Sequence, residues 1–209
     1  MSQNDDFQHY FTTDPDVPSD PRILRVKLRG HRIELWTDTG VFSCERVDTG
    51  TKALIKAMRI EPDEDVLDWG AGYGVIGIVA ALMEPTCRVT MVEMNQRAAD
   101  LAERNIERNA VKNATVIAGE APDVLQDRRF DRILCNAPVS RGRQVVLDMI
   151  SDSRARLRPG GELWTVIHTR RGAKRYIRTL EETFAEAWTE TITGGYRVLV
   201  GRKAETEEI

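Results

Sequence analysis

Short apolar runs alternate with longer segments of helical spacing through most of the chain. The runs end at glycine, asparagine or an acid, which is typical of buried strands bounded by turns. They predict seven strands, at about 65–68, 89–93, 114–118, 131–135, 162–168, 187–193 and 196–202. Apolar residues spaced three and four apart predict helices at about 74–84, 95–109, 141–157 and 170–184. Strands alternating with helices predict an α/β fold with a doubly wound, mostly parallel seven-stranded sheet.

Local turn and capping residues refine this prediction. The last two strands are joined by Gly194-Gly195, a dipeptide that favours a β-hairpin, so the sheet gains an antiparallel edge strand. Asn95 can cap the helix at 95–109, and Thr51 is the predicted cap of a further helix at 52–59. The segment 158–161, Arg-Pro-Gly-Gly, predicts a turn before the fifth strand.

The N-terminal region has a different pattern. Residues 1–20 contain five acids and no Lys or Arg, which predicts a flexible acidic arm. Apolar and basic residues then alternate at 23–29 and again at 32–36, with Gly30 between them, which predicts an N-terminal β-hairpin extension. Its outward face carries Arg22, Arg25, Lys27 and Arg29. Both a solubilising face and a polyanion-binding face fit these charges.

The segment 65–77, Asp-Val-Leu-Asp-Trp-Gly-Ala-Gly-Tyr-Gly-Val-Ile-Gly, predicts a strand, a tight glycine turn and a helix. Its last three glycines fit G-x-G-x-x-G, and Glu93 follows at the end of the next strand, where an acid can bind ribose hydroxyls. An ordinary glycine turn, a dinucleotide site and an S-adenosylmethionine site all remain open on this pattern. Asp68 favours the third, because it would repel a pyrophosphate but attract the amino group of the methionine portion.

Composition narrows the class of protein. The chain has 209 residues, 41% apolar and 30% charged, with a net charge of −3, which predicts one soluble globular domain. No apolar run is long enough to span a membrane, and the N-terminus lacks a signal-peptide pattern, so a cytoplasmic location is expected. The three cysteines are widely spaced and the three histidines do not cluster with them, which predicts neither disulfides nor a metal site.

The stretch 67–72, Leu-Asp-Trp-Gly-Ala-Gly, resembles the first motif of the class I S-adenosylmethionine-dependent methyltransferases. This resemblance implies a Rossmann-like methyltransferase fold and S-adenosylmethionine as cofactor. It also implies that Glu93 binds the ribose and that Glu120 binds the adenine amino group, although an acid beside a short helix start is an equally good interpretation of Glu120. The implied cofactor-binding residues are Asp68, Gly70, Ala71, Gly72, Gly74, Glu93, Met94, Glu120, Ala121 and Asn136.

The resemblance extends to the segment before the glycine turn. Gly40-Val-Phe-Ser43 and Asp48-Thr-Gly50 look like the elements that border the active cleft in the small-domain methyltransferases, which include ribosomal RNA guanine-N2 enzymes. The implied organisation is an acidic arm (1–20), a hairpin and cleft-bordering segment (21–50), a methyltransferase domain (51–203) and a tail (204–209).

The fourth strand ends in Asn136-Ala-Pro-Val139, which resembles the N-P-P-aromatic motif of enzymes that methylate exocyclic amino or amide nitrogens. The resemblance implies that Asn136, Ala137 and Pro138 form the catalytic turn, with the Asn side-chain oxygen and the next carbonyl accepting both amino hydrogens. Ala137 replaces a proline, which leaves the carbonyl in place. Val139 replaces an aromatic residue and offers no ring for stacking. An ordinary Asn-Pro turn is the alternative interpretation.

Basic residues follow the predicted cleft in sequence. Arg170, Arg171, Lys174, Arg175 and Arg178 come after the fifth strand, and four of them can share one helix face. Such a cluster is either a solvated surface or a track for a phosphate backbone. The predicted substrate-binding residues are Phe42, Val139, Arg141, Arg143, Arg170, Arg171, Tyr196 and Arg197.

These observations together predict an S-adenosylmethionine-dependent N-methyltransferase acting on guanine N2 of ribosomal or other structured RNA. Three alternatives remain open: a glutamine-amide protein methyltransferase, a small-molecule methyltransferase and a non-catalytic cofactor-binding partner subunit. The sequence predicts RNA as partner, no membrane and no metal, and leaves the oligomeric state open.

Overall fold

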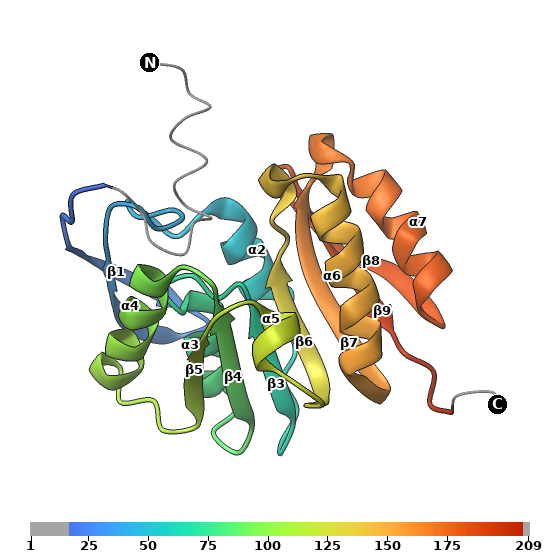
Figure 1. The fold of residues 1–209 in the computed structure, drawn as a ribbon, viewed down its shortest axis with the longest axis horizontal. Coiled ribbons are helices and arrows are strands. Elements are labelled where there is room, and N and C mark those ends of the chain that lie inside the picture. Colours follow the sequence, from blue (N-terminus) through green and yellow to red (C-terminus); the bar gives the residue numbers. More distant parts are fainter. Residues whose placement is uncertain (1–16, 207–209) are drawn as a thin grey trace.

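The computed structural model describes residues 17–206, so most of the predicted acidic arm lies outside the described residues. A seven-stranded sheet with the order β5-β4-β3-β6-β7-β9-β8 forms the centre of the molecule (Figure 1). Its strands are β3 (Asp65–Trp69), β4 (Arg88–Glu93), β5 (Ala114–Ala118), β6 (Phe130–Asn136), β7 (Leu157–His168), β8 (Glu186–Thr193) and β9 (Tyr196–Arg202). The predicted fold class is therefore confirmed.

Helices cover both faces of this sheet. They are α2 (Thr49–Ala57), α3 (Val75–Met83), α4 (Gln96–Arg108), α5 (Ala121–Val124), α6 (Arg143–Arg156) and α7 (Ala173–Thr183), with short 3-10 turns η1 (Val139–Arg141) and η2 (Thr169–Arg171). Strand residues alternate between two buried apolar clusters: Val66 packs with α2, α3 and α4, whereas Leu67 packs with α5, α6 and α7. The short apolar runs of the sequence thus correspond to strands that are buried on both faces.

The first five strands of the sheet are parallel, and β9 runs against them. β9 pairs antiparallel with both β7 and β8, and Gly194 and Gly195 form the turn with φ of 55° and 81°. The predicted hairpin is confirmed, but the prediction that the antiparallel strand lies at the edge is wrong: β9 lies between β7 and β8, and the edge strand β8 runs parallel to β7. The turn predicted at 158–161 is instead an irregular bulge within β7, because Leu157 pairs with Phe130 while Glu162 pairs with Arg132.

The predicted N-terminal hairpin is confirmed as a separate two-stranded sheet of β1 (Arg22–Leu28) and β2 (His31–Thr37). Side chains of α4 bind the free edge of β2. The Asn105 Oδ1 accepts a hydrogen bond from the Trp36 N–H at 2.6 Å, and its Nδ2 donates to the Trp36 carbonyl oxygen at 2.9 Å. Asn109 makes the same pair of bonds with Glu34. Two asparagines one helical turn apart therefore replace a neighbouring strand and fix the hairpin beside the sheet.

Helix α2 begins earlier than predicted. Its N-cap is Asp48, whose carboxylate accepts hydrogen bonds from the N–H groups of Gly50 and Thr51, so the prediction of Thr51 as cap is wrong. Asp is a stronger N-cap residue than Thr, and the helix starts three residues earlier than predicted. Asn95, in contrast, caps α4 as predicted, accepting from the Ala98 N–H at 3.0 Å. No helix within residues 17–206 is long and apolar enough to cross a membrane.

Candidate active site

A cavity of about 550 Å³ lies at the carboxyl ends of β3, β4 and β6. Its walls come from the loops that follow these strands, from α5 and α6, and from the segment before α2. The order of strands reverses between β3 and β6, and ligands of open α/β sheets bind at such a switch point. The volume lies within the range of small-molecule sites.

The glycine loop between β3 and α3 lines this cavity with backbone. Gly70 and Gly72 have φ of 72° and 58°, a region that side chains disfavour. Apart from chain neighbours, no atom of residues 17–206 lies within 4 Å of where either Cβ would be. The N–H groups of Gly70 and Ala71 both donate to the Val92 carbonyl oxygen, at 2.9 and 3.0 Å. The loop is therefore a fixed surface that a ligand can approach closely.

Glu93, at the end of β4, accepts a hydrogen bond from this loop and keeps free lone pairs. Its Oε2 accepts from the Gly72 N–H at 2.8 Å and its Oε1 from the Asn95 N–H at 2.9 Å. Burial raises the pKa of the Glu93 carboxyl, although these hydrogen bonds oppose the shift. A carboxylate has about four lone-pair sites, so acceptor capacity remains for a ligand hydroxyl.

Asp68 lies beneath the glycine loop and is fully buried. Its Oδ2 accepts from the Gly77 N–H at 2.8 Å, in the first turn of α3, whose own N-cap Gly74 offers no side chain. Its Oδ1 has no hydrogen-bond partner among residues 17–206. Burial, and to a smaller extent the charge of Glu93, raises the pKa of Asp68 to about 7. Asp68 therefore acts as the cap of α3, a role that the sequence reasoning missed.

The end of β6 forms a second wall. Pro138 has φ −78° and ψ 59°, an inverse γ-turn in which the Val139 N–H donates to the Ala137 carbonyl oxygen at 2.8 Å. The proline ring restricts φ to about this value, which fixes the direction of the Ala137 carbonyl. The Asn136 Nδ2 donates to the Asp48 Oδ2 at 3.2 Å and to the Thr51 Oγ1 at 3.0 Å. Asn136 is thus held against the start of α2.

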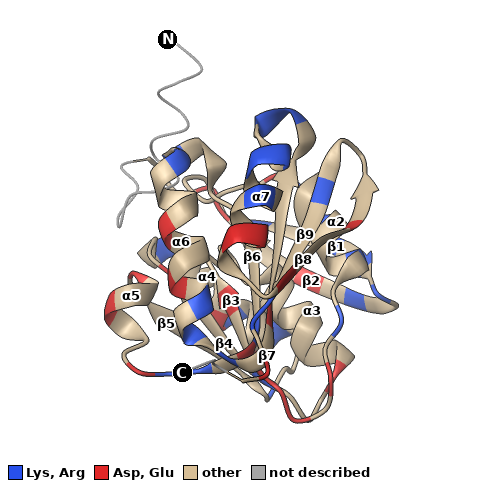
Figure 2. Cartoon of the chain, turned by 90° about the vertical axis from the view of Figure 1, so that its right-hand side faces the viewer, with Lys and Arg blue, Asp and Glu red and all other residues tan. Residues whose placement is uncertain are grey.

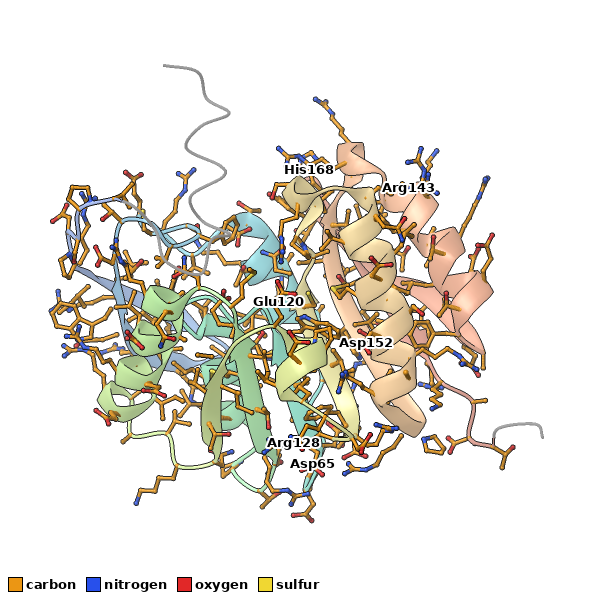
Figure 3. The ribbon with its side chains drawn as sticks, in the orientation of Figure 1. Asp65, Glu120, Arg128, Arg143, Asp152 and His168 are labelled. Carbon is orange, nitrogen blue, oxygen red and sulfur yellow. The ribbon has the colours of Figure 1, made fainter. Side chains whose placement is uncertain are left out.

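A third wall carries charged groups from α5, η1 and α6. Glu120 lies 3.8 Å from Arg141 in an ion pair, and the Arg141 guanidinium also contacts the Met94 sulfur at 3.1 Å. Figure 3 shows Glu120 and Asp152 on the elements that face each other across this part of the molecule. Asp148 and Asp152, one turn apart on α6, line the cavity. The sequence reasoning missed both, although their i, i+4 spacing was visible.

The cavity brings most of the predicted site residues together. Those that line it are Phe42, Gly70, Ala71, Gly72, Glu93, Met94, Glu120, Ala121, Asn136, Ala137, Pro138 and Arg141. Those outside its lining are Asp68, Gly74, Val139, Arg143, Arg170, Arg171, Tyr196 and Arg197. The sequence reasoning also missed Asp48 and Thr51, since nothing in the local pattern links them to a residue 88 and 85 positions away.

The predicted residues outside the lining lie in different surroundings. Val139 is half-buried against the α5, α6 and α7 side of the core. The Tyr196 ring lies edge-on to His168, with centroids 4.9 Å apart. Arg143, Arg170 and Arg171 are exposed. Figure 2 shows Lys and Arg along the upper part of α7, next to this end of the sheet. The described residues contain no cluster of His, Cys, Asp and Glu that could hold a metal ion.

The fold has a glycine loop after β3, an acid at the end of β4 and an Asn-x-Pro turn at the end of β6. These features define a methyltransferase of the Rossmann-like class. A family model described as "Methyltransferase small domain" matches residues 32–200, and the chain belongs to this family. The resemblance read from the sequence is thereby confirmed.

Individual relatives agree with this assignment. The uncharacterized protein YbxB of Bacillus subtilis is 33% identical over 94% of this chain and 98% of its own length. Ribosomal RNA small subunit methyltransferase C of Mannheimia succiniciproducens is 35% identical over 77% of this chain and 45% of its own. The Thermus thermophilus 16S rRNA N2 G1207 methyltransferase, solved with AdoMet and guanosine, has a TM-score of 0.79, is 28% identical and is matched over 90% of this chain and 52% of its own. The chain thus spans about half of these ribosomal RNA enzymes.

Proposed function

We propose that this protein transfers a methyl group from S-adenosylmethionine to an exocyclic amino nitrogen, and that the acceptor is guanine N2 of ribosomal RNA. One observation carries the proposal: Asn136, at the end of β6, lines the same cavity as the glycine loop and Glu93. A cofactor lying on the loop and an amino group held by Asn136 would therefore meet in one space.

The residues present fit the cofactor. The open space above Gly70 and Gly72 would accommodate the methionine portion, and Glu93 has lone pairs left for the ribose hydroxyls. Apolar side chains and the acids of α5 and α6 surround the remaining space, where Glu120 would accept from the adenine amino group. S-adenosylmethionine, when bound, supplies a methyl group activated by a positive sulfur.

The Asn136 turn fits an amino acceptor. An exocyclic amino group has two hydrogens, and the Asn136 Oδ1 and the Ala137 carbonyl can accept one each. The Val139 N–H occupies only one of the two lone pairs of the Ala137 carbonyl. These two hydrogen bonds direct the nitrogen lone pair toward the methyl group. Because this methyl group is already activated, such positioning supplies most of the acceleration of methyl transfer.

RNA is the acceptor that the surroundings and the relatives favour. The exposed Arg143 begins α6 after β6, and the exposed Arg170 and Arg171 lie in η2 directly after β7, so all three are at the same end of the sheet as Asn136 and can contact phosphates. Two of the relatives described above are named as ribosomal RNA methyltransferases, and the solved one was crystallised with guanosine. A cytoplasmic location, where ribosomes are made, belongs to this proposal.

A methyl-transfer assay tests it. Purified protein is incubated with S-adenosylmethionine carrying a labelled methyl group and with ribosomal RNA, free or in subunits, from cells that lack this gene. Mass spectrometry of the digested RNA is expected to show labelled N2-methylguanosine, and Asn136→Ala should lower its rate of formation by a factor of about 100 to 1,000. A label on another nucleoside or on a ribosomal protein, or full activity of Asn136→Ala, would overturn the proposal.

A further inference from the structure

Asn136 has a second set of contacts that the proposed chemistry does not use. The Asp48 carboxylate and the Thr51 hydroxyl, both at the start of α2, accept hydrogen bonds from its Nδ2 at 3.2 and 3.0 Å. Among residues 17–206 no hydrogen bond to the Asn136 Oδ1 is found. The amide therefore faces the protein with its nitrogen and leaves its oxygen available.

The chemistry of the two partners dictates this orientation. A side-chain amide has a donor end and an acceptor end of nearly the same shape. The Asp48 carboxylate only accepts. The Thr51 hydroxyl gives its one hydrogen to the Asp48 Oδ2, so it can meet Asn136 only as an acceptor. A reversed amide would place its oxygen against two oxygens that offer no hydrogen.

Asp48 is itself held in place by the helix it caps. Its Oδ1 accepts from the Gly50 N–H at 2.7 Å, and both its oxygens lie 3.3 Å from the Thr51 nitrogen, which donates to them. The start of a helix stabilises a negative charge. The Tyr196 ring packs so closely on Gly50 that a Cβ there would lie 2.8 Å from it. Asp48 thus has little freedom to turn away from Asn136.

We propose that Asp48, together with Thr51, is a positioning residue for methyl transfer: it locks the Asn136 amide with Oδ1 facing the acceptor amino group. The negative charge behind Nδ2 also polarises the amide, which makes Oδ1 a stronger acceptor. This inference rests on the proposed function and adds to it a residue that acts through Asn136.

Asp48→Asn tests the lock with little change in shape. An Asn caps a helix about as well as an Asp, so α2 keeps its start. One end of the new amide must accept from the Gly50 N–H, and its NH2 then faces Asn136. The Asn136 amide is expected to turn over, which places a donor where the amino group needs an acceptor. We expect kcat to fall about 100-fold, as for other small misplacements of reacting groups. The affinity for S-adenosylmethionine and the melting temperature should stay close to wild type.

A double variant separates positioning from mere stabilisation. Asn136→Asp alone places two carboxylates 3.2 Å apart and should impair activity. Asp48→Asn combined with Asn136→Asp exchanges the two groups: the new Asn donates to the new Asp, whose second oxygen again faces the cavity as an acceptor. We expect the double variant to regain at least about 10-fold over either single variant, an interaction that only a double-mutant cycle isolates.

Two further variants keep the test independent of folding. Thr51→Ser retains the hydroxyl and should remain active, whereas Thr51→Val removes it and should lower kcat. Asp38→Asn is the matched control, because Asp38 lies in the same segment and binds Ser19 and Thr39 rather than Asn136, so kcat should not change.

The outcomes distinguish this inference from the proposed function. Wild-type kcat in Asp48→Asn, or absence of any recovery in the double variant, overturns the lock even when Asn136→Ala is inactive. Full activity of Asn136→Ala overturns the proposed function instead.

Discussion

The amino and carboxyl ends of the strands in the central sheet differ in how their carboxylates are paired. At the amino ends of the strands, Asp65 binds Arg88 and Arg158, each at 2.6 Å. These partners hold the pKa of Asp65 below its usual range. At the carboxyl ends, Asp68 of the same strand forms no ion pair within residues 17–206, and burial raises its pKa to about 7. Figure 3 shows Asp65 at the lower end and His168 and Arg143 at the upper end.

The paired groups at the amino ends of the strands contribute to stability, whereas the acceptors at the carboxyl ends are available for function. At the lower end, the buried Arg132 joins Glu64 and Glu162 at 2.6 and 2.7 Å, and Arg202 continues the network to Glu162. At the upper end, polar groups of Asn136 and Glu93 line the cavity and keep lone pairs without a protein partner among the described residues. Groups that are fully paired have no free lone pairs for a ligand. Acceptors with free lone pairs at the switch point of the sheet can bind one.

The largest expected effect is at the lower end. Arg132→Ala should reduce the free energy of unfolding by about 3–5 kcal/mol, because it leaves the largely buried Glu64 without its cation and Glu162 with only Arg202 as an ion-pair partner among the described residues. Methyl transfer per folded molecule should be unchanged. Urea unfolding and a methyl-transfer assay on the same preparation check both statements.

Arg88→Ala is the matched control for Arg132→Ala. It removes an ion pair with Asp65 in which the arginine is mostly exposed, so it should cost much less. Equal losses of stability in the two variants would contradict the role given to burial.

At the upper end the reverse separation is expected. Asn136→Ala should lower kcat by a factor of about 100 to 1,000, since it removes a preorganised contact to the reacting group. Its midpoint of urea unfolding should stay near that of the wild type. A loss of activity that merely follows a loss of folded protein would remove the contrast between the two ends.

Asp68→Asn sharpens the comparison through pH. The raised pKa means that the folded state binds a proton more tightly than the unfolded chain, whose Asp titrates near 3.9. Wild-type stability therefore falls as pH rises from about 4 to about 7, by at most about 1.4 kcal/mol per pH unit. The Asn variant, which mimics the protonated form, should lack this loss.

Melting temperatures from pH 4.5 to 8 test the Asp68 prediction. The wild type should fall progressively below the Asn variant and the gap should stop growing above about pH 7. Parallel curves at all pH values would show that Asp68 does not titrate in this range.

The sequence pattern predicted the ends of strands and helices correctly where those ends depend on neighbouring residues. β5 spans the predicted 114–118, and Asn95 caps α4, because each boundary depends on neighbouring residues alone. The glycine loop, Glu93 and Asn136 could be assigned to one edge of the sheet because parallel strands end there together.

Features that depend on tertiary contacts could not be predicted. The bulge at 158–161 depends on how β7 pairs with β6, and the capping of α3 by Asp68 depends on the strand passing beneath the helix. The contact of Asp48 with Asn136 joins residues 88 positions apart. The roles of Arg143, Arg170, Arg171, Tyr196 and Arg197 toward RNA stay predictions, since these residues lie outside the cavity.

The smallest expected effect concerns the basic surface. Replacing both Arg170 and Arg171 with Ala should weaken RNA binding several-fold and reduce the slope of log affinity against log salt by about 0.7–0.9 for each lost phosphate contact. Binding of S-adenosylmethionine should not change. Arg128→Ala, an exposed arginine at the opposite end (Figure 3), is the control and should leave the salt dependence as it is.

The central claim is that the cofactor and the amino group meet at Asn136. A crystal structure with S-adenosylhomocysteine and guanosine measures this directly. The account predicts adenosine hydroxyls hydrogen-bonded to Glu93 and a distance of about 3 Å between the Asn136 Oδ1 and the guanine N2. A guanine bound elsewhere, or an Asn136 amide whose nitrogen faces the ligand, would contradict it.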